Sequence, residues 1–193
     1  EHDFFDELRV YAPDMKRVAW TVCLHNTELG IRHPEYAVRN AYGDPYHYNL
    51  CPAFEEVQEY VAILCADMAE LYELDGIALE TPGFLPYEHG FHHEFSLLPL
   101  NRWVKWLLGL CFSDASVAGA AAAGIDVARL RQQTMDSIDH FFANAKAVSD
   151  ETAFEWWIAD LVTDPEWAAF LNWRCSVVTD LVARVRAALP KET

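Results

Sequence analysis

The chain is poor in basic residues, and this shortage limits what it can bind. It has 14 lysines and arginines against 30 acidic residues, which gives a formal net charge of -16. Such a charge repels the phosphate backbone of nucleic acids and anionic lipid surfaces, so we expect neither nucleic acid nor a membrane as a partner. A neutral or cationic ligand would not be repelled by this negative charge.

Long apolar runs and a disulfide pattern are also missing. No window reaches the roughly 18 apolar residues of a membrane helix, and no basic start followed by an apolar stretch marks a secretory signal. The five cysteines are odd in number and scattered, which favours free thiols in a reducing compartment. We therefore expect a cytoplasmic protein. With 8 glycines, 9 prolines and 52% apolar residues, residues 1–193 form one globular domain.

The most informative segment is an apolar stretch, residues 74–80, that ends on the carboxylate of Glu80. A nearly continuous apolar run is typical of a strand covered by helices on both faces, so we expect this strand to be buried on both sides. An acid at its carboxyl end then lies at the rim where α/β folds place their chemistry.

The periodicity around this strand predicts a parallel βαβ unit. Residues 17–24 are rich in Val, Trp and Thr and are expected to form a strand, and apolar residues at three-four spacing from residue 54 predict the helix that leads to residues 74–80. We read residues 30–52 as a long irregular connection. Helices are expected at 4–11, 100–110, 118–123 and 127–147 and after Asp164-Pro165, with no third strand.

The order of the motifs resembles that of uncharacterised, glycoside-hydrolase-like TIM barrels. The resemblance covers about residues 17–189 and rests on a strand ending His25-Asn26, a Cys-Pro before a helix, an Asp-Gly-Ile strand ending on Glu80, a Gly-Phe loop and a Cys-Phe before an alanine-rich helix. It implies an α/β fold, a partial (β/α)8 TIM barrel with about two parallel strands visible and a helix-rich C-terminal half.

Length and one motif set this chain apart from that pattern. A closed barrel typically needs about 250 residues and eight strands, so we expect an internal segment of a larger catalytic domain, whose open sheet edge is covered by the rest of the barrel or by a second copy. Relatives carry Cys-Tyr/Phe-Cys-x-x-Cys where this chain has Cys111, Ser113 and Ser116. With two potential thiolate ligands replaced, we expect no thiolate metal cluster, and no cofactor.

The resemblance implies cleavage of a glycosidic bond, which requires two carboxylates. Glu80 is the first candidate, as nucleophile or as acid/base, with helix capping or loop bracing as its structural alternative. Glu88 and Glu94 follow in the next loop and are candidates for the second carboxylate, unless they are solvated loop acids or the partner lies on a strand outside this chain. Asp75, at the opposite end of the strand, is expected to be structural.

Polar side chains near the same rim are candidates for carbohydrate binding. His25 and Asn26 follow the first strand, His92 and His93 lie in the loop with Glu94, and Tyr87 offers a ring. A further candidate is Asn49, which either joins this pocket or forms the turn that leads into the following helix.

Two other functions remain open from the sequence. One is a barrel that binds carbohydrate without cleaving it, because it has lost a carboxylate. The other is a metal-dependent hydrolase that uses the three histidines and the one acid of residues 89–94, although their spacing does not match the helical His-Glu-x-x-His signature.

Overall fold

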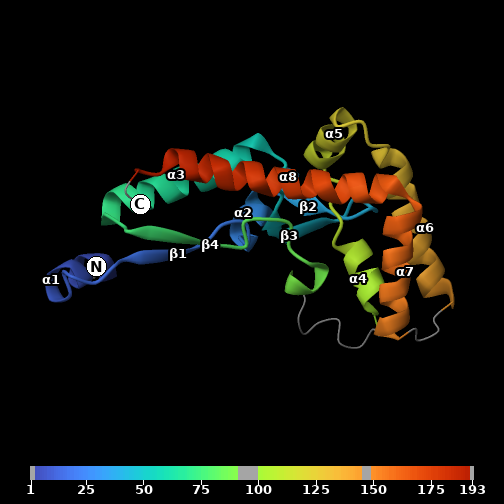
Figure 1. Ribbon diagram of the computed structural model, residues 1–193, viewed down its shortest axis with the longest axis horizontal. Coiled ribbons are helices and arrows are strands. Elements are labelled where there is room, and N and C mark those ends of the chain that lie inside the picture. The colour runs from blue at the N-terminus through green and yellow to red at the C-terminus, as the bar shows by residue number, and fades with distance from the viewer. Residues whose placement is uncertain (1–2, 91–99, 145–148, 192–193) are drawn as a thin grey trace.

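The computed structural model describes residues 3–90, 100–144 and 149–191 and shows an elongated, mostly helical α/β molecule (Figure 1). The N-terminal helix and a parallel strand pair lie at one end, and a group of helices lies at the other. The elements in chain order are α1 (Phe4–Tyr11), β1 (Val18–Val22), α2 (Thr27–Arg32), η1 (Pro34–Tyr36), β2 (Ala37–Arg39), β3 (Pro45–Leu50), α3 (Glu55–Tyr72), β4 (Gly76–Glu80), η2 (Tyr87–Gly90), α4 (Arg102–Leu108), α5 (Asp114–Ala122), α6 (Val127–Asn144), α7 (Asp150–Thr163) and α8 (Pro165–Ala188).

The predicted βαβ unit is confirmed. Strands β1 and β4 pair in parallel, with Val18 opposite Gly76 and Val22 opposite Glu80, and α3 connects them. Helix α3 buries Val57, Val61 and three further residues of its apolar stripe, as its three-four spacing predicts. The carboxyl ends of both strands therefore meet at one edge.

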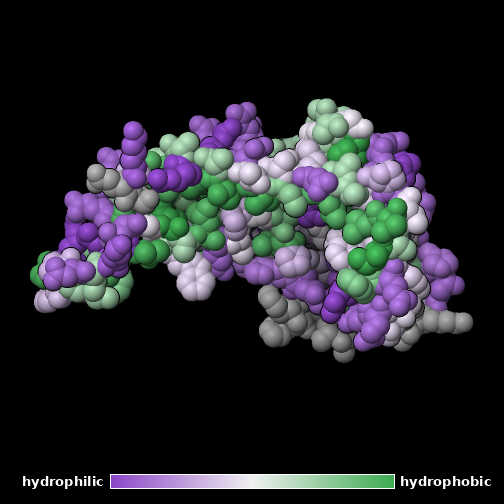
Figure 2. Space-filling view, viewed as in Figure 1, coloured by the Kyte–Doolittle hydropathy of each residue, from purple (hydrophilic) through white to green (hydrophobic). Residues whose placement is uncertain are grey.

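The expectation that β4 is buried on both faces is wrong for the described part of the chain. Helices α3 and α8 cover one face, where Ile77 and Leu79 pack on the core. On the other face, the β1 residue Trp20 is 76% exposed, and its neighbours Val18 and Val22 are exposed too. Hydrophobic residues gather on the surface around this strand pair (Figure 2). The apolar run thus marks a strand with one uncovered face.

The segment read as an irregular connection instead holds α2, η1 and the antiparallel hairpin of β2 and β3, so the expectation of no third strand is also wrong. The turn is stabilised by Asn40, whose side-chain oxygen accepts from the backbone N–H groups of Tyr42 and Asp44, and Gly43 adopts a φ of 96°. Strand β2 has only three residues, too few for alternation to be visible in the sequence.

Helix α8 joins two separate cores. Near its start, Trp167 and Phe170 pack with the C-terminal helices, and near its end Leu181 and Val185 pack with α3 and the parallel strands. Its predicted start is confirmed, since the side chain of Asp164 caps it and proline occupies its first turn. Helix α7, which lies against α4 and α8, was not predicted. No helix among the described residues is both long and apolar enough to cross a bilayer.

Candidate functional site

The candidate site lies where β1 and β4 end. Glu80 pairs with Val22, and the backbone ladder continues as the N–H of Cys23 donates to the carbonyl of Glu80 at 2.9 Å. Because side chains alternate along a strand and Ile77 and Leu79 face the core, Glu80 lies on the uncovered face. Among the described residues, no group donates a hydrogen bond to its carboxylate or pairs with it. The end of β4 therefore carries a carboxylate that has no partner among the described residues.

The residue after Glu80 carries backbone strain. Thr81 has a φ of 51°, a conformation that β-branched residues rarely adopt, and its buried hydroxyl has no hydrogen-bond partner among the described residues. Its carbonyl accepts from the N–H of Leu24, and the carbonyl of Leu24 accepts from Leu50. Strain of this kind costs on the order of 1–3 kcal/mol and is concentrated at functional sites.

Residues 23–26 lie between two other segments, one following β4 and one at the end of β3. On the side of β3, His25 forms an isolated antiparallel bridge with Asn49. Asn49 is fully buried in β3, so it is not part of a turn before α3. Neither its side-chain oxygen nor its nitrogen has a hydrogen-bond partner among the described residues. An unpaired buried amide costs about 1–3 kcal/mol, which a ligand hydroxyl or a bridging water would offset.

Two histidines meet at this rim from distant parts of the sequence. The Nε2 atom of His89 in η2 lies 3.1 Å from Nδ1 of His25, and the two rings form an edge-to-face pair with centroids 4.5 Å apart. Such a hydrogen bond requires one ring nitrogen to donate and the other to accept. The aromatic ring of Tyr48 lies edge-on to His25, and Gly90 packs directly against that tyrosine ring. A side chain at position 90 would displace η2, so glycine allows this approach.

Two sequence candidates have local structural roles. The side-chain oxygen of Asn26 accepts from the N–H of Leu29 at 3.0 Å and caps α2, which leaves only its amide N–H groups for a ligand. The carboxylate of Asp75 accepts from the N–H of Arg17 at 2.8 Å and fixes the start of β1. The structural role expected for Asp75 agrees with this contact.

The remaining candidates do not join Glu80 in the described structure. Glu88 is exposed and forms an ion pair with Lys105 at 2.5 Å, and Tyr87 lines the same cavity as these two residues. Glu94, His92 and His93 lie outside the described residues. The structure thus gathers His25, His89, Asn49 and Glu80 at or beside the rim, and places Glu88 elsewhere.

A cluster of two cysteines and two serines lies buried behind the site. The side chains of Cys51, Cys111, Ser113 and Ser116 approach one another pairwise at 3.2–3.6 Å. Burial raises the pKa of Cys51. Although burial also opposes a thiolate at Cys111, hydrogen bonds from Cys51 and the two serines lower the pKa of Cys111. The spacing of Cys111 to Ser116 was visible in the sequence, but the participation of Cys51 was not.

Neither a disulfide nor a metal-binding set of histidines, cysteines and acids occurs among the described residues. All five cysteines are free, as expected, and Cys23 and Cys65 lie in the core. No group of three or more His, Cys, Asp or Glu side chains converges within residues 3–90, 100–144 and 149–191. The cysteine-serine cluster offers only two of the four thiolates that an all-cysteine structural zinc site requires.

Comparisons with protein-family models, with curated proteins and with solved structures gave no match for this chain.

Proposed function

We propose that the chain is part of a glycoside-hydrolase-like TIM barrel that cleaves a glycosidic bond, with Glu80 as nucleophile or acid/base. The observation that carries the proposal is the carboxylate of Glu80, which has no partner among the described residues and lies on the uncovered face of a parallel strand pair, at the carboxyl end of its strand. In a barrel, helices cover the outer face of the strands, as α3 and α8 do here, and the opposite face lines the interior.

The neighbouring groups suit a substrate rich in hydroxyl groups. Nε2 of His25, whose Nδ1 faces His89, can donate to or accept from a hydroxyl group, and the amide of Asn49 offers a donor and an acceptor that have no partner among the described residues. In this proposal these groups bind and orient the sugar, while Glu80 exchanges a proton with the glycosidic oxygen or attacks the anomeric carbon. The strained turn at Thr81 holds the carboxylate at the rim.

The second carboxylate has to come from another segment. Glu88 is exposed and pairs with Lys105 in a cavity that Glu80 does not line, which favours the interpretation of Glu88 as a solvated loop acid. We propose that the partner of Glu80 is Glu94 or an acid on another strand of the barrel. The separation of the two carboxyl groups would decide the outcome, about 5 Å for retention and about 6.5–9.5 Å for inversion.

Turnover of a panel of aryl glycosides tests the proposal. Glu80→Gln keeps the size of the side chain and removes its acid chemistry, so we expect kcat to fall by about 10²–10⁴ with little change in binding. Glu59→Gln, on the exposed side of α3, is the matched control and should leave kcat unchanged. Equal turnover by the wild type and Glu80→Gln would contradict the assignment.

The non-catalytic alternative is favoured by one observation: Glu88, a candidate for the second carboxylate, pairs with Lys105 and lines a cavity that Glu80 does not line. It predicts that oligosaccharides bind to the wild type and to Glu80→Gln alike, with no turnover of any glycoside. The metal-dependent alternative predicts stoichiometric zinc or iron in purified protein. A clearly substoichiometric metal content after dialysis would rule out that alternative.

A further inference from the structure

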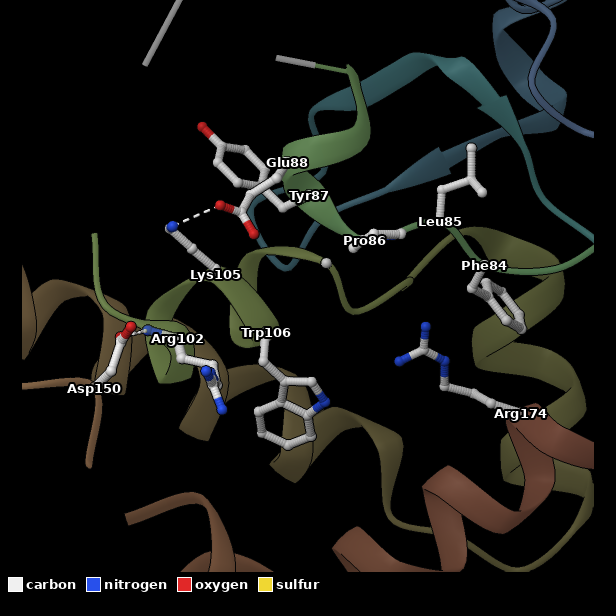
Figure 3. A pocket seen from close by; sticks show the side chains of 11 residues that line it. Phe84, Leu85, Pro86, Tyr87, Glu88, Arg102, Lys105, Trp106, Asp150 and Arg174 are labelled. Carbon is white, nitrogen blue, oxygen red and sulfur yellow. Dashed lines mark hydrogen bonds and ion pairs between the residues drawn. The ribbon is translucent and has the colours of Figure 1, made fainter. Parts of the chain in front are cut away.

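One cavity has a lining that does not include Glu80 and that combines charged and aromatic side chains. Its volume is about 550 Å³, and it is enclosed by the segment before η2, by η2, α4, the start of α7 and α8 (Figure 3). Three of the 14 basic residues of this acidic protein, Arg102, Lys105 and Arg174, line it. Glu88 and Asp150 also line the cavity, so its lining has a small formal positive charge, in contrast to the negative net charge of the chain.

Within the described part of the chain, the acids that line the cavity do not pair with the guanidinium groups of Arg102 and Arg174. Glu88 pairs with Lys105, and a carboxylate oxygen of Asp150 accepts from the backbone N–H of Arg102. No hydrogen bond or ion pair joins the guanidinium of Arg102 or Arg174 to another described side chain. Both groups therefore keep their N–H donors free for a ligand.

Arg174 is held in place by packing. Its guanidinium carbon lies 4.6 Å from the centre of the Phe84 ring, and its side chain extends from α8 toward the cavity (Figure 3). Burial lowers the pKa of Arg174, and the nearby thiols of Cys111 and Cys51 partly offset this effect. A guanidinium remains charged in proteins, and a partly buried cation without a hydrogen-bonded acceptor is costly. An anion in the cavity would relieve that cost.

Trp106 lies between the two arginines along the cavity wall (Figure 3). The flat face of an indole ring is a suitable platform for a ring-shaped ligand, and a guanidinium on either side matches a planar carboxylate, which it binds through two parallel hydrogen bonds. The cavity therefore combines a stacking surface with carboxylate recognition.

The cavity is also close to the candidate catalytic rim along the chain. Phe84 follows Glu80 by four residues, so their Cα atoms are at most about 14 Å apart. Gly83, between them, packs against Val178 of α8, where an added Cβ would lie 3.1 Å from the valine side chain. This packing keeps the connecting segment on α8, with the rim at one end and the cavity at the other.

We propose that this cavity binds an acidic sugar, a uronate, whose carboxylate pairs with Arg174 and whose ring lies against Trp106. This inference rests on the proposed function and specifies its substrate class as a carbohydrate that contains uronate units. One oligosaccharide then extends from the cavity to the Glu80 rim.

Calorimetric titration of the chain with trigalacturonate, with the corresponding neutral trigalactoside and with inorganic phosphate tests the proposal. We expect binding of trigalacturonate and at least about tenfold weaker binding of the other two, since a charge-assisted hydrogen bond contributes about 1.5–3 kcal/mol. Equal affinity for the neutral sugar would overturn the acidic specificity. Phosphate binding as tight as that of the uronate would show a general anion site and overturn carboxylate recognition.

Substitutions of single arginines test where trigalacturonate binds. Arg174→Gln should weaken trigalacturonate binding by at least about tenfold. Arg102 is exposed, so Arg102→Gln should weaken trigalacturonate binding by up to about fivefold. Arg184→Gln is the control. Arg184 lies on α8, as Arg174 does, but it pairs with Glu55 outside the cavity. Unchanged affinity in both cavity variants would refute the proposal.

The same titration in Glu80→Gln separates the two proposals. Uronate binding that persists in this variant, without turnover by the wild type, would leave the cavity assignment intact and contradict the hydrolase. Turnover of neutral glycosides without any uronate binding would contradict the cavity assignment alone.

Discussion

The unpaired amide of Asn49 allows a sharp test of whether this site is built for binding. We expect Asn49→Leu to stabilise the fold while it weakens carbohydrate binding. Asn49 is fully buried, and neither polar atom of its side chain has a partner among the described residues. Replacing an unsatisfied amide by an apolar side chain of similar volume removes a desolvation cost of about 1–3 kcal/mol.

A stabilisation of about 1–2 kcal/mol is expected, because imperfect packing of the branched leucine offsets part of the gain. For a chain of 193 residues this corresponds to an increase in Tm of roughly 2–8 °C. Urea unfolding followed by tryptophan fluorescence measures the difference directly. An unchanged m value would show that the comparison reports stability and not a change in the unfolded state.

Asn101→Leu provides the matched control. Asn101 is also buried, and its side-chain nitrogen also has no hydrogen-bond partner in the described part of the chain, but its side-chain oxygen accepts from the N–H of Val104 and caps α4. Losing this cap should destabilise the protein by about 0.5–2 kcal/mol. If Asn49→Leu instead lowers the free energy of unfolding by more than about 1 kcal/mol, the amide stabilises the fold. This result would refute a ligand-binding role for Asn49.

Three further predictions concern the fold. Gly30→Ala should destabilise the protein by about 1–3 kcal/mol in urea unfolding, because the new Cβ would lie 2.0 Å from the backbone oxygen of His47. Trp20→Ser should change stability by less than about 0.5 kcal/mol and reduce self-association in analytical ultracentrifugation, because this side chain is 76% exposed; a large loss of stability would show that its face is covered. The hydrogen bond from Arg129 lowers the pKa of Asp164, so its charge stabilises the folded state above the pKa of the unfolded chain, and this contribution is lost as the pH falls through the lower folded value. Asp164→Asn, which retains a capping side chain, should therefore be less stable than the wild type at pH 7 and equal to it near pH 2; a difference independent of pH would contradict this.

Local chemistry was enough to predict most of the helices and the βαβ unit. The start of α8 follows from Asp164-Pro165, since a capping carboxylate and a proline in the first turn act within a few residues. Helix α3 follows from the spacing of apolar residues such as Val57 and Val61. The hairpin was missed because β2 has only three residues and its partner strand begins with Pro45. Helix α7 has only one buried residue, Ala153, which explains its weak apolar stripe.

The sequence alone thus determined that Glu80 ends a strand beside a parallel neighbour. Side-chain periodicity and the order strand, helix, strand are both visible along the chain. Only the tertiary structure decided what surrounds it. His89 contacts His25 across 64 residues, the amide of Asn49 is buried with no hydrogen-bond partner among the described residues, and Arg174 lines a cavity formed by segments that are distant in sequence. These contacts between distant segments depend on how all the elements pack together, and no short-range pattern of residues encodes them.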